Sequence, residues 1–283
     1  MSDFRPGRFQ ILPPVVKNLI LLNGLMWAAS IAIGYFWKFD LVDLLGLYFP
    51  TSENFHPYEL VTHMFMHAYI DPHSGGIYFW HIFSNMFALW MFGSVLENVW
   101  GAKRFLFFYL SCGLGGALMH LGVTWWQVHQ MQVVVQDYIE HPGIPQFATL
   151  AAKYDNFLNM KEVQKFIDAW KLSPDSASFI NQSINYASGF PNLIADIPIV
   201  GASGAVFGVL IAFGLLFPNT YLYVYFFLPV KAKYFVIFYA LFELFAGVGG
   251  AQDGIAHFAH IGGAVIGFII VKYWNRNRRT DFF

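Results

Sequence analysis

Apolar residues fall along this chain in long runs that are broken by short polar segments. A helix that crosses the hydrocarbon core of a bilayer needs about 20 mostly apolar residues, so each run is expected to form one span. Six runs qualify, at about 16–37, 79–96, 105–128, 198–217, 234–248 and 255–274. The pattern predicts an all-α, polytopic membrane protein, with six transmembrane helices in a single domain, 1–283.

Two long segments between the runs differ in character. Residues 40–78 keep many apolar and aromatic side chains, which favours short helices lying in the membrane interface. Residues 129–197 are polar and carry charges of both signs, and helical periodicity runs from about 147 to 170. We therefore expect 129–197 to be an inserted outer loop that folds as a small helical subdomain. It could recognise substrates or partners, or be a passive addition.

The composition supports a bilayer as the surroundings. The chain is 57% hydrophobic and 12% charged, whereas soluble domains carry about 25% charged residues. A net charge of −1 gives no reason to expect a nucleic-acid partner. The single cysteine, Cys112, allows no intrachain disulfide.

Basic residues indicate the orientation, because Lys and Arg of short loops gather on the cytoplasmic side. The residues that share one side of a six-span arrangement are Arg5, Arg8, Lys17, Lys103, Arg104, Lys231, Lys233, Lys272, Arg276, Arg278 and Arg279. The opposite short segments hold only Lys38. This predicts that both termini are cytoplasmic. Compact loops and an N-terminus without a secretory or transit pattern favour a bacterial cytoplasmic membrane.

The fourth run begins with a serine between glycines, in Gly201-Ala-Ser203-Gly204. Gly204 and Gly208 are four residues apart, so they share a helix face that another helix can approach closely. The serine is then either an accessible nucleophile or part of a packing motif, bonded to its own helix.

The sixth run carries His260 on one face with Gly263 and Gly267. Packing this glycine stripe against that of the fourth run would bring His260 to Ser203. An ionisable group within a span suggests function, and a near-neutral imidazole is the usual base for a hydroxyl nucleophile. The alternative is a neutral histidine bonded to a carbonyl. Asp253 precedes His260 by about 10 Å of helix, too far for a direct bond, so we expect a dyad, with Asp253 capping the helix.

The second run opens with His81 and Asn85, which share a face near the outer end. Two such donors, with the backbone N–H of Ser203, suit an oxyanion hole. For Asn85 alone, hydrogen bonding between helices is the simpler interpretation.

Other ionisable residues have plainer explanations. His63 and His67, with His73 after them, lack the glutamate of H-E-x-x-H, so structural hydrogen bonds are favoured over a metal site. Glu243 either makes a structural hydrogen bond or touches substrate. Glu97 is expected to be structural, and His257 to support His260 or lie at the interface.

Taken together, these motifs resemble those of the rhomboid family of intramembrane serine proteases over about 15–130 and 197–275. The matching motifs are Gly201-x-Ser203-Gly204, Ala259-His260-x-x-Gly263-x-x-x-Gly267, His81-x-x-x-Asn85 and Thr62-His63-x-x-x-His67. The resemblance implies a six-helix rhomboid-like bundle, Ser203 as nucleophile, His260 as base, and His81 and Asn85 as oxyanion donors. It also implies that the substrates are single-span membrane proteins and that the reaction needs no cofactor or metal.

The chain departs from the family pattern in its first loop, where Tyr58 and Glu59 replace the usual Trp-Arg pair. Phe207 replaces a tyrosine, keeping a ring to stack under His260 but losing the hydroxyl. The insertion 129–197 is longer than a minimal member needs. The main alternative is a non-proteolytic rhomboid-like protein that binds membrane clients, although such relatives usually lack the serine or the histidine. A transporter would spread ionisable groups along several spans, whereas here they cluster near one face.

Overall fold

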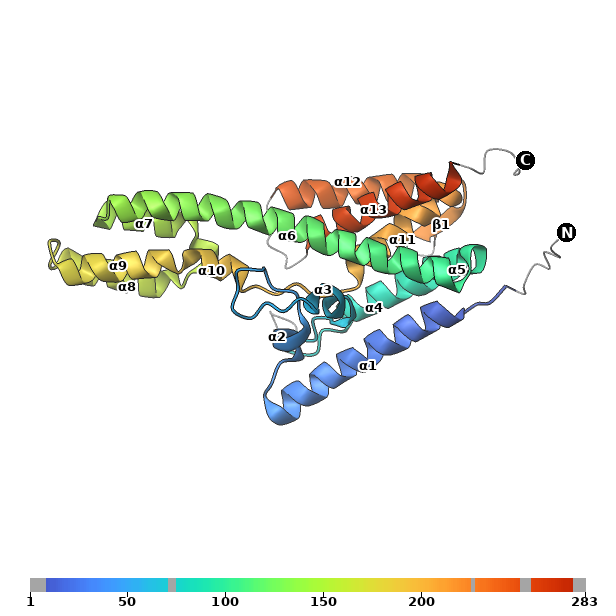
Figure 1. Cartoon of the computed structure of the whole chain (residues 1–283), viewed down its shortest axis with the longest axis horizontal. Coiled ribbons are helices and arrows are strands. Elements are labelled where there is room, and N and C mark those ends of the chain that lie inside the picture. The colour runs from blue at the N-terminus through green and yellow to red at the C-terminus, as the bar shows by residue number, and fades with distance from the viewer. Residues whose placement is uncertain (1–8, 71–74, 225–226, 250–255, 277–283) are drawn as a thin grey trace. The chain divides into compact units, whose positions relative to one another are not determined.

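The computed structural model describes residues 9–70, 75–224, 227–249 and 256–276 of the chain (Figure 1). The chain divides into two compact units, described separately below. The membrane unit comprises Met1–Leu47, Pro57–His120 and Ile199–Phe283, and the inserted unit comprises Tyr48–His56 and Leu121–Pro198.

The membrane unit contains the apolar helices. They are α1 (Pro14–Trp37), α4 (Phe79–Ala88), a π turn (Leu89–Gly93) continuous with α5 (Ser94–Trp100), the first half of α6 (Ala102–Glu140), α11 (Ser203–Leu216), α12 (Ala232–Val248) and α13 (His257–Asn275). Among the described residues, four helical stretches are long and apolar enough to cross a membrane: Pro14–Trp37, Phe79–Trp100, Ala102–Glu140 and His257–Asn275. With 14 and 17 residues, α11 and α12 are shorter.

The helices coincide with the six predicted runs, and the all-α membrane fold is confirmed. One boundary differs substantially. The run predicted to end at 128 continues as helix to Glu140, giving α6 39 residues. Such a helix is about 58 Å long, nearly twice the hydrocarbon thickness of about 30 Å. Met131, Val135 and Tyr138 are buried at helical spacing beyond 128, so the helix continues after the strongly apolar stretch ends.

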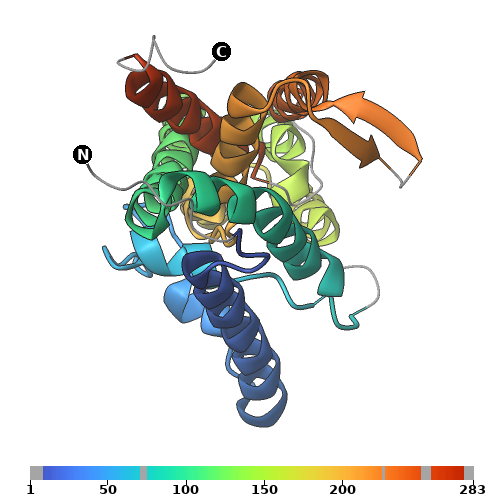
Figure 2. The ribbon, with the colours of Figure 1, turned by 90° about the vertical axis from the view of Figure 1, so that its right-hand side faces the viewer.

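Short elements connect the spans of the membrane unit. The first loop forms α2 (Leu41–Leu45), α3 (Glu59–Thr62) and a 3₁₀ turn (His63–Phe65), where short interface helices were expected. An antiparallel hairpin of β1 (Tyr221–Val224) and β2 (Leu228–Lys231) precedes α12. Figure 2 shows this hairpin standing out from the helices, and the pattern of apolar runs did not predict it.

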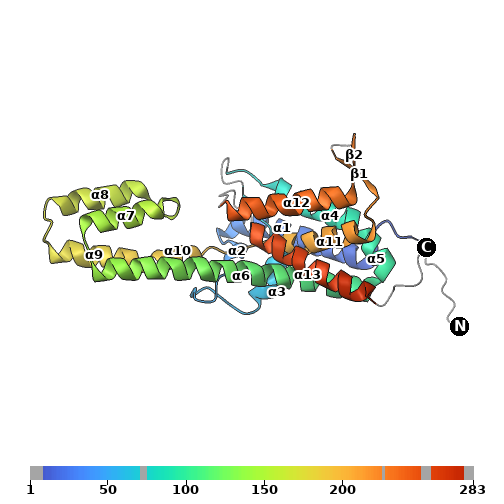
Figure 3. The same ribbon diagram turned by 90° about the horizontal axis from the view of Figure 1, so that it is seen from above.

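The inserted unit is helical, as expected for 129–197. Its elements are the second half of α6, α7 (Ile144–Lys153), a 3₁₀ turn (Asp155–Phe157), α8 (Met160–Lys171), α9 (Ala177–Ser188) and α10 (Phe190–Ala195). The periodic stretch 147–170 is thus two helices, which lie side by side (Figure 3). Phe147 and Trp170 are buried in its core.

Candidate active site

Ser203 is the first residue of α11, and a sharp backbone turn precedes it. Gly201 has a φ of +128°, a conformation that side chains other than hydrogen rarely allow. The Gly201 N–H donates to the carbonyl of His63 at 2.9 Å, which ties the turn to the first loop. The first N–H groups of a helix have no intrahelical acceptor, so the start of α11 offers donors beside the half-buried serine.

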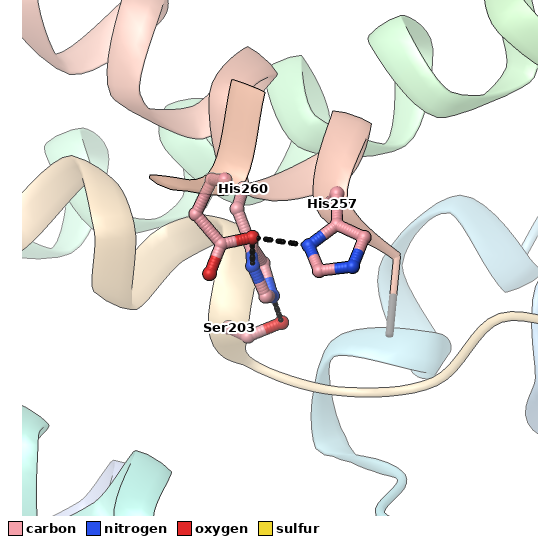
Figure 4. A network of polar contacts seen from close by, with 4 residues as sticks. Ser203, His257 and His260 are labelled. Atoms are coloured by element: carbon pink, nitrogen blue, oxygen red, sulfur yellow. Dashed lines mark hydrogen bonds and ion pairs between the residues drawn. The ribbon is translucent and has the colours of Figure 1, made fainter. Parts of the chain in front are cut away.

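His260 lies in the first turn of α13 and contacts the serine directly. Its Nε2 is 2.8 Å from Ser203 Oγ (Figure 4). The imidazole stacks on Phe207, with ring centroids 4.2 Å apart and planes within 7°. Phe207 in turn packs against Tyr239 of α12 at 4.8 Å. The sequence-based expectation that Phe207 lies against His260 agrees with this arrangement, and the stack restricts rotation of the ring.

Glycines let α11 and α13 approach at backbone distance. A Cβ at Gly263 would lie 1.8 Å from the Gly204 carbonyl oxygen, and one at Gly267 would lie 2.9 Å from Gly208 Cα. The two helices therefore contact each other along both predicted stripes and lie side by side in Figures 1 and 3. This close approach sets the separation of Ser203 and His260.

His81, in the first turn of α4, is oriented to donate toward the serine. Its Nδ1 accepts from the Ala68 N–H at 3.2 Å, so the neutral ring carries its proton on Nε2. A Cβ at Gly201 would lie 3.2 Å from His81 Nε2 and 3.6 Å from Ser203 Oγ. The missing side chain of Gly201 thus leaves space between a hydroxyl and an N–H donor, which suits an oxyanion.

Asn85 is buried one turn after His81. Its side-chain amide donates to the His81 carbonyl at 2.9 Å. That bond uses one of the two amide hydrogens and leaves the other for a further acceptor. This bond lies within α4, whereas the simpler interpretation had expected one between helices, and it places Asn85 beside the other proposed oxyanion donor.

Glu243 of α12 makes the contact that the sequence did not reveal. Its Oε2 lies 2.8 Å from His260 Nδ1 and 2.7 Å from His257 Nδ1. The carboxylate is 3% exposed. The sequence left open whether Glu243 makes a structural hydrogen bond or touches substrate, because it does not show that α12 and α13 lie side by side. An acid within an apolar run was the available signal.

The remaining candidates are dispersed. Glu97 accepts the N–H groups of Val15 and Val16 at 3.0 and 2.8 Å, so it caps the start of α1. His63 Nδ1 contacts the Glu59 carbonyl at 2.7 Å, which matches the structural role expected of it. Asp253 and His73 lie outside the described residues.

Burial affects the histidines of the first loop. It lowers the pKa of His63 to about 4, and burial together with the nearby His81 ring lowers the pKa of His67 to about 3. Both rings are therefore neutral at physiological pH.

One group of side chains in the described part of the chain could hold a metal ion. The donor atoms of Glu243, His257 and His260 all lie within 4.8 Å of one another. The same atoms already form the hydrogen bonds between these three residues, which account for their arrangement.

Comparison with known proteins gives two matches. Residues 54–126 and 175–276 match the family model described as the rhomboid domain, and this range includes Ser203, His260, His81, Asn85 and Glu243. The chain is also 26% identical over 196 residues to "Rhomboid protein 1, mitochondrial" of Saccharomyces cerevisiae. That match covers 69% of this chain and 38% of the relative, so the chain spans less than half of the relative's length.

Proposed function

Because the chain belongs to the rhomboid family, we propose that it is a serine endopeptidase that cleaves single-span membrane proteins within the bilayer. The 2.8 Å contact between Ser203 Oγ and His260 Nε2 is the observation that carries this proposal. A serine hydroxyl becomes a nucleophile when an adjacent base takes its proton, and here the base lies at hydrogen-bonding distance.

The first half of the proposed reaction forms an acyl-enzyme. His260 Nε2 removes the Ser203 proton as the oxygen attacks the scissile carbonyl carbon. The carbonyl oxygen takes up the negative charge and is stabilised by the Ser203 N–H, His81 Nε2–H and the Asn85 amide. The C–N bond then breaks, and His260 returns the proton to the leaving amine.

The second half releases the acyl group. Water replaces the amine, His260 takes one of its protons, and the hydroxide attacks the ester carbon. Collapse of the second tetrahedral intermediate returns the proton to Ser203 Oγ and frees the new carboxylate. Ser203 is only half-buried at the very start of α11, which supports access of water to the ester. The proposed cycle uses only groups of this chain and water.

The proposed substrate class rests on membership of the rhomboid family. A helical peptide bond is hydrogen-bonded and shielded, so a transmembrane segment must unwind before attack. Single-span proteins with small or helix-weakening residues near the cut are therefore the proposed substrates. We further propose that both termini lie in the cytoplasm, from the distribution of Lys and Arg. A bacterial cytoplasmic membrane remains part of the proposal, while the relative's name places that protein in mitochondria.

Cleavage of a single-span substrate by the purified protein in detergent tests the proposal. We expect the parent protein to cut the substrate. Cleavage by Ser203→Ala and by His260→Ala should fall to the background rate. Gly24→Ala, in α1 with no atom within 4 Å of the added methyl, is the matched control and should cut normally. Cutting by all the variants would overturn the mechanism. A folded parent that binds the substrate without cutting it would favour the client-binding alternative.

A further inference from the structure

The buried carboxylates of Glu243 and Glu97 accept hydrogen bonds from different kinds of group. Glu97 accepts from backbone N–H groups and caps a helix. Glu243 instead accepts from two imidazoles, one of which contacts the proposed nucleophile. A charge placed within an apolar span is costly, so a buried carboxylate at this position suggests a role beyond packing.

The protons of this network can be assigned from its geometry. An ionised carboxylate only accepts hydrogen bonds, so the Nδ1 atoms of His257 and His260 must both donate to Glu243 Oε2. A neutral His260 with its proton on Nδ1 has a bare Nε2. That nitrogen lies 2.8 Å from Ser203 Oγ and can accept the hydroxyl proton.

We infer that Glu243 is the positioning residue of a Ser203–His260–Glu243 triad, held in place by His257. This inference rests on the proposed function and deepens it, because the sequence had suggested a dyad. Glu243 fixes the tautomer and the ring orientation of His260. It also stabilises the imidazolium that forms when His260 takes the serine proton.

The proton balance of the triad needs no additional reactant. The Ser203 O–H bond breaks as its proton passes to His260 Nε2 and its oxygen bonds to the substrate carbon. The imidazolium then carries a proton on each nitrogen. Glu243 stays ionised throughout, and the Nε2 proton leaves with the amine. A carboxylate that only orients and stabilises is the established logic of serine triads in general.

His257 gives the carboxylate its fixed position. It lies one turn before His260 on α13 and is 3% exposed. Its N–H satisfies part of the hydrogen-bonding capacity of a carboxylate that is removed from water, and charge-assisted bonds of this kind are among the stronger ones. Gly247 of α12 permits this approach, because a Cβ there would come 3.2 Å from His257 Cβ. The backbone contact of α12 with α13 therefore places Glu243 between both rings.

The test compares Glu243→Gln with Glu97→Gln, which removes a buried carboxylate far from the reaction. For Glu243→Gln we expect kcat to fall by about 10²–10⁴-fold with KM close to that of the parent, because the base loses its tautomer and its counter-charge. Glu243→Asp should recover part of the activity. For His257→Phe, kcat should fall roughly 10-fold, because one hydrogen bond to the Glu243 carboxylate is removed. Glu97→Gln should keep the parent kcat per folded molecule.

Two readouts separate this inference from the proposed function. A fluorophosphonate probe reports how fast Ser203 is activated without any protein substrate, and its labelling rate should fall in Glu243→Gln as kcat does. Nitrogen NMR of histidine-labelled parent protein, with His260 assigned by its loss in His260→Ala, should show the proton on Nδ1 and a bare Nε2.

If Glu243→Gln keeps the kcat and the labelling rate of the parent, the triad is wrong but the serine mechanism still stands. The same holds if NMR finds the His260 proton on Nε2. If the parent neither cuts nor labels, the proposed function fails. The NMR measurement still decides the tautomer in that case, and also if Glu243→Gln does not fold.

Discussion

The membrane unit and the inserted unit hold their helices together with different side chains. In the membrane unit, α11 and α13 touch along glycines, and a Cβ at Gly263 would lie 1.8 Å from a backbone oxygen. In the inserted unit, large aromatic side chains fill the core, with Phe147 and Trp170 almost fully buried. Small residues bring helices together where lipid removes the hydrophobic driving force, and aromatic burial stabilises helices in water.

The difference also concerns polar groups. The membrane unit buries Glu243, His257 and His260 in one network. The inserted unit keeps ion pairs such as Lys165–Glu162 on its surface, with side chains that are 72% and 64% exposed. The buried network of ionisable groups therefore marks the candidate site of the membrane unit, whereas this ion pair of the inserted unit lies on its surface.

The largest expected effect tests the aromatic core of the inserted unit. Trp170→Ala should destabilise that unit by about 3–5 kcal/mol, because a large buried side chain is removed. Hydrogen exchange should show faster exchange in α7, α8 and α9, while probe labelling of Ser203 persists. Leu172→Ala, at a side chain that is 86% exposed, is the control. If Trp170→Ala also lost probe labelling of Ser203, the stability of the two units would not be independent.

Acidification tests the membrane unit through its first loop. The pKa values of His63 and His67 in the folded protein, about 4 and about 3, lie below the ordinary 6.5. The unfolded chain therefore takes up protons first as pH falls. The stabilising contribution is complete above about pH 6.5 and declines below it, by about 2 kcal/mol for each histidine at about pH 5.

Thermal unfolding in detergent between about pH 7 and 5 measures this decline, with His67→Phe as the comparison. The variant should lose less stability over that range than the parent. An equal loss in both proteins would contradict the assigned pKa of His67.

A single methyl group tests the glycine contact. Gly263→Ala should destabilise the membrane unit by about 1–3 kcal/mol, because helices forced apart lose their packing. It should also slow labelling of Ser203, because Ser203 and His260 separate. Gly24→Ala, whose methyl meets nothing within 4 Å, should be neutral or stabilising by up to about 1 kcal/mol. Equal stability and equal labelling of the two variants would contradict a role of the glycine contact in placing Ser203 and His260.

The smallest expected effect concerns the surface of the inserted unit. Lys165→Ala breaks the exposed pair with Glu162 and should change stability by less than about 1 kcal/mol. Chemical denaturation followed by tryptophan fluorescence measures the change. A larger loss would mean that this surface contributes to structure, and would weaken the contrast between the units.

The sequence predicted much of this architecture, since apolar runs of span length report helices directly. It also predicted the meeting of Ser203 with His260, because glycines at helical spacing mark faces that can touch. It did not reveal the partner of Glu243, since a partner on another helix depends on how α12 and α13 are placed. The extension of α6 to Glu140 was missed because hydropathy marks where lipid ends, not where a helix ends. The β1–β2 hairpin was missed because four-residue strands carry little periodic signal.

Mass spectrometry of protein treated with a fluorophosphonate probe shows whether Ser203 is a nucleophile activated by His260, because it identifies the modified residue without a known substrate. We expect one adduct, on Ser203, in the parent protein, and almost none in His260→Ala. An adduct on a different residue, or equal labelling of Ser203 in His260→Ala, would contradict it.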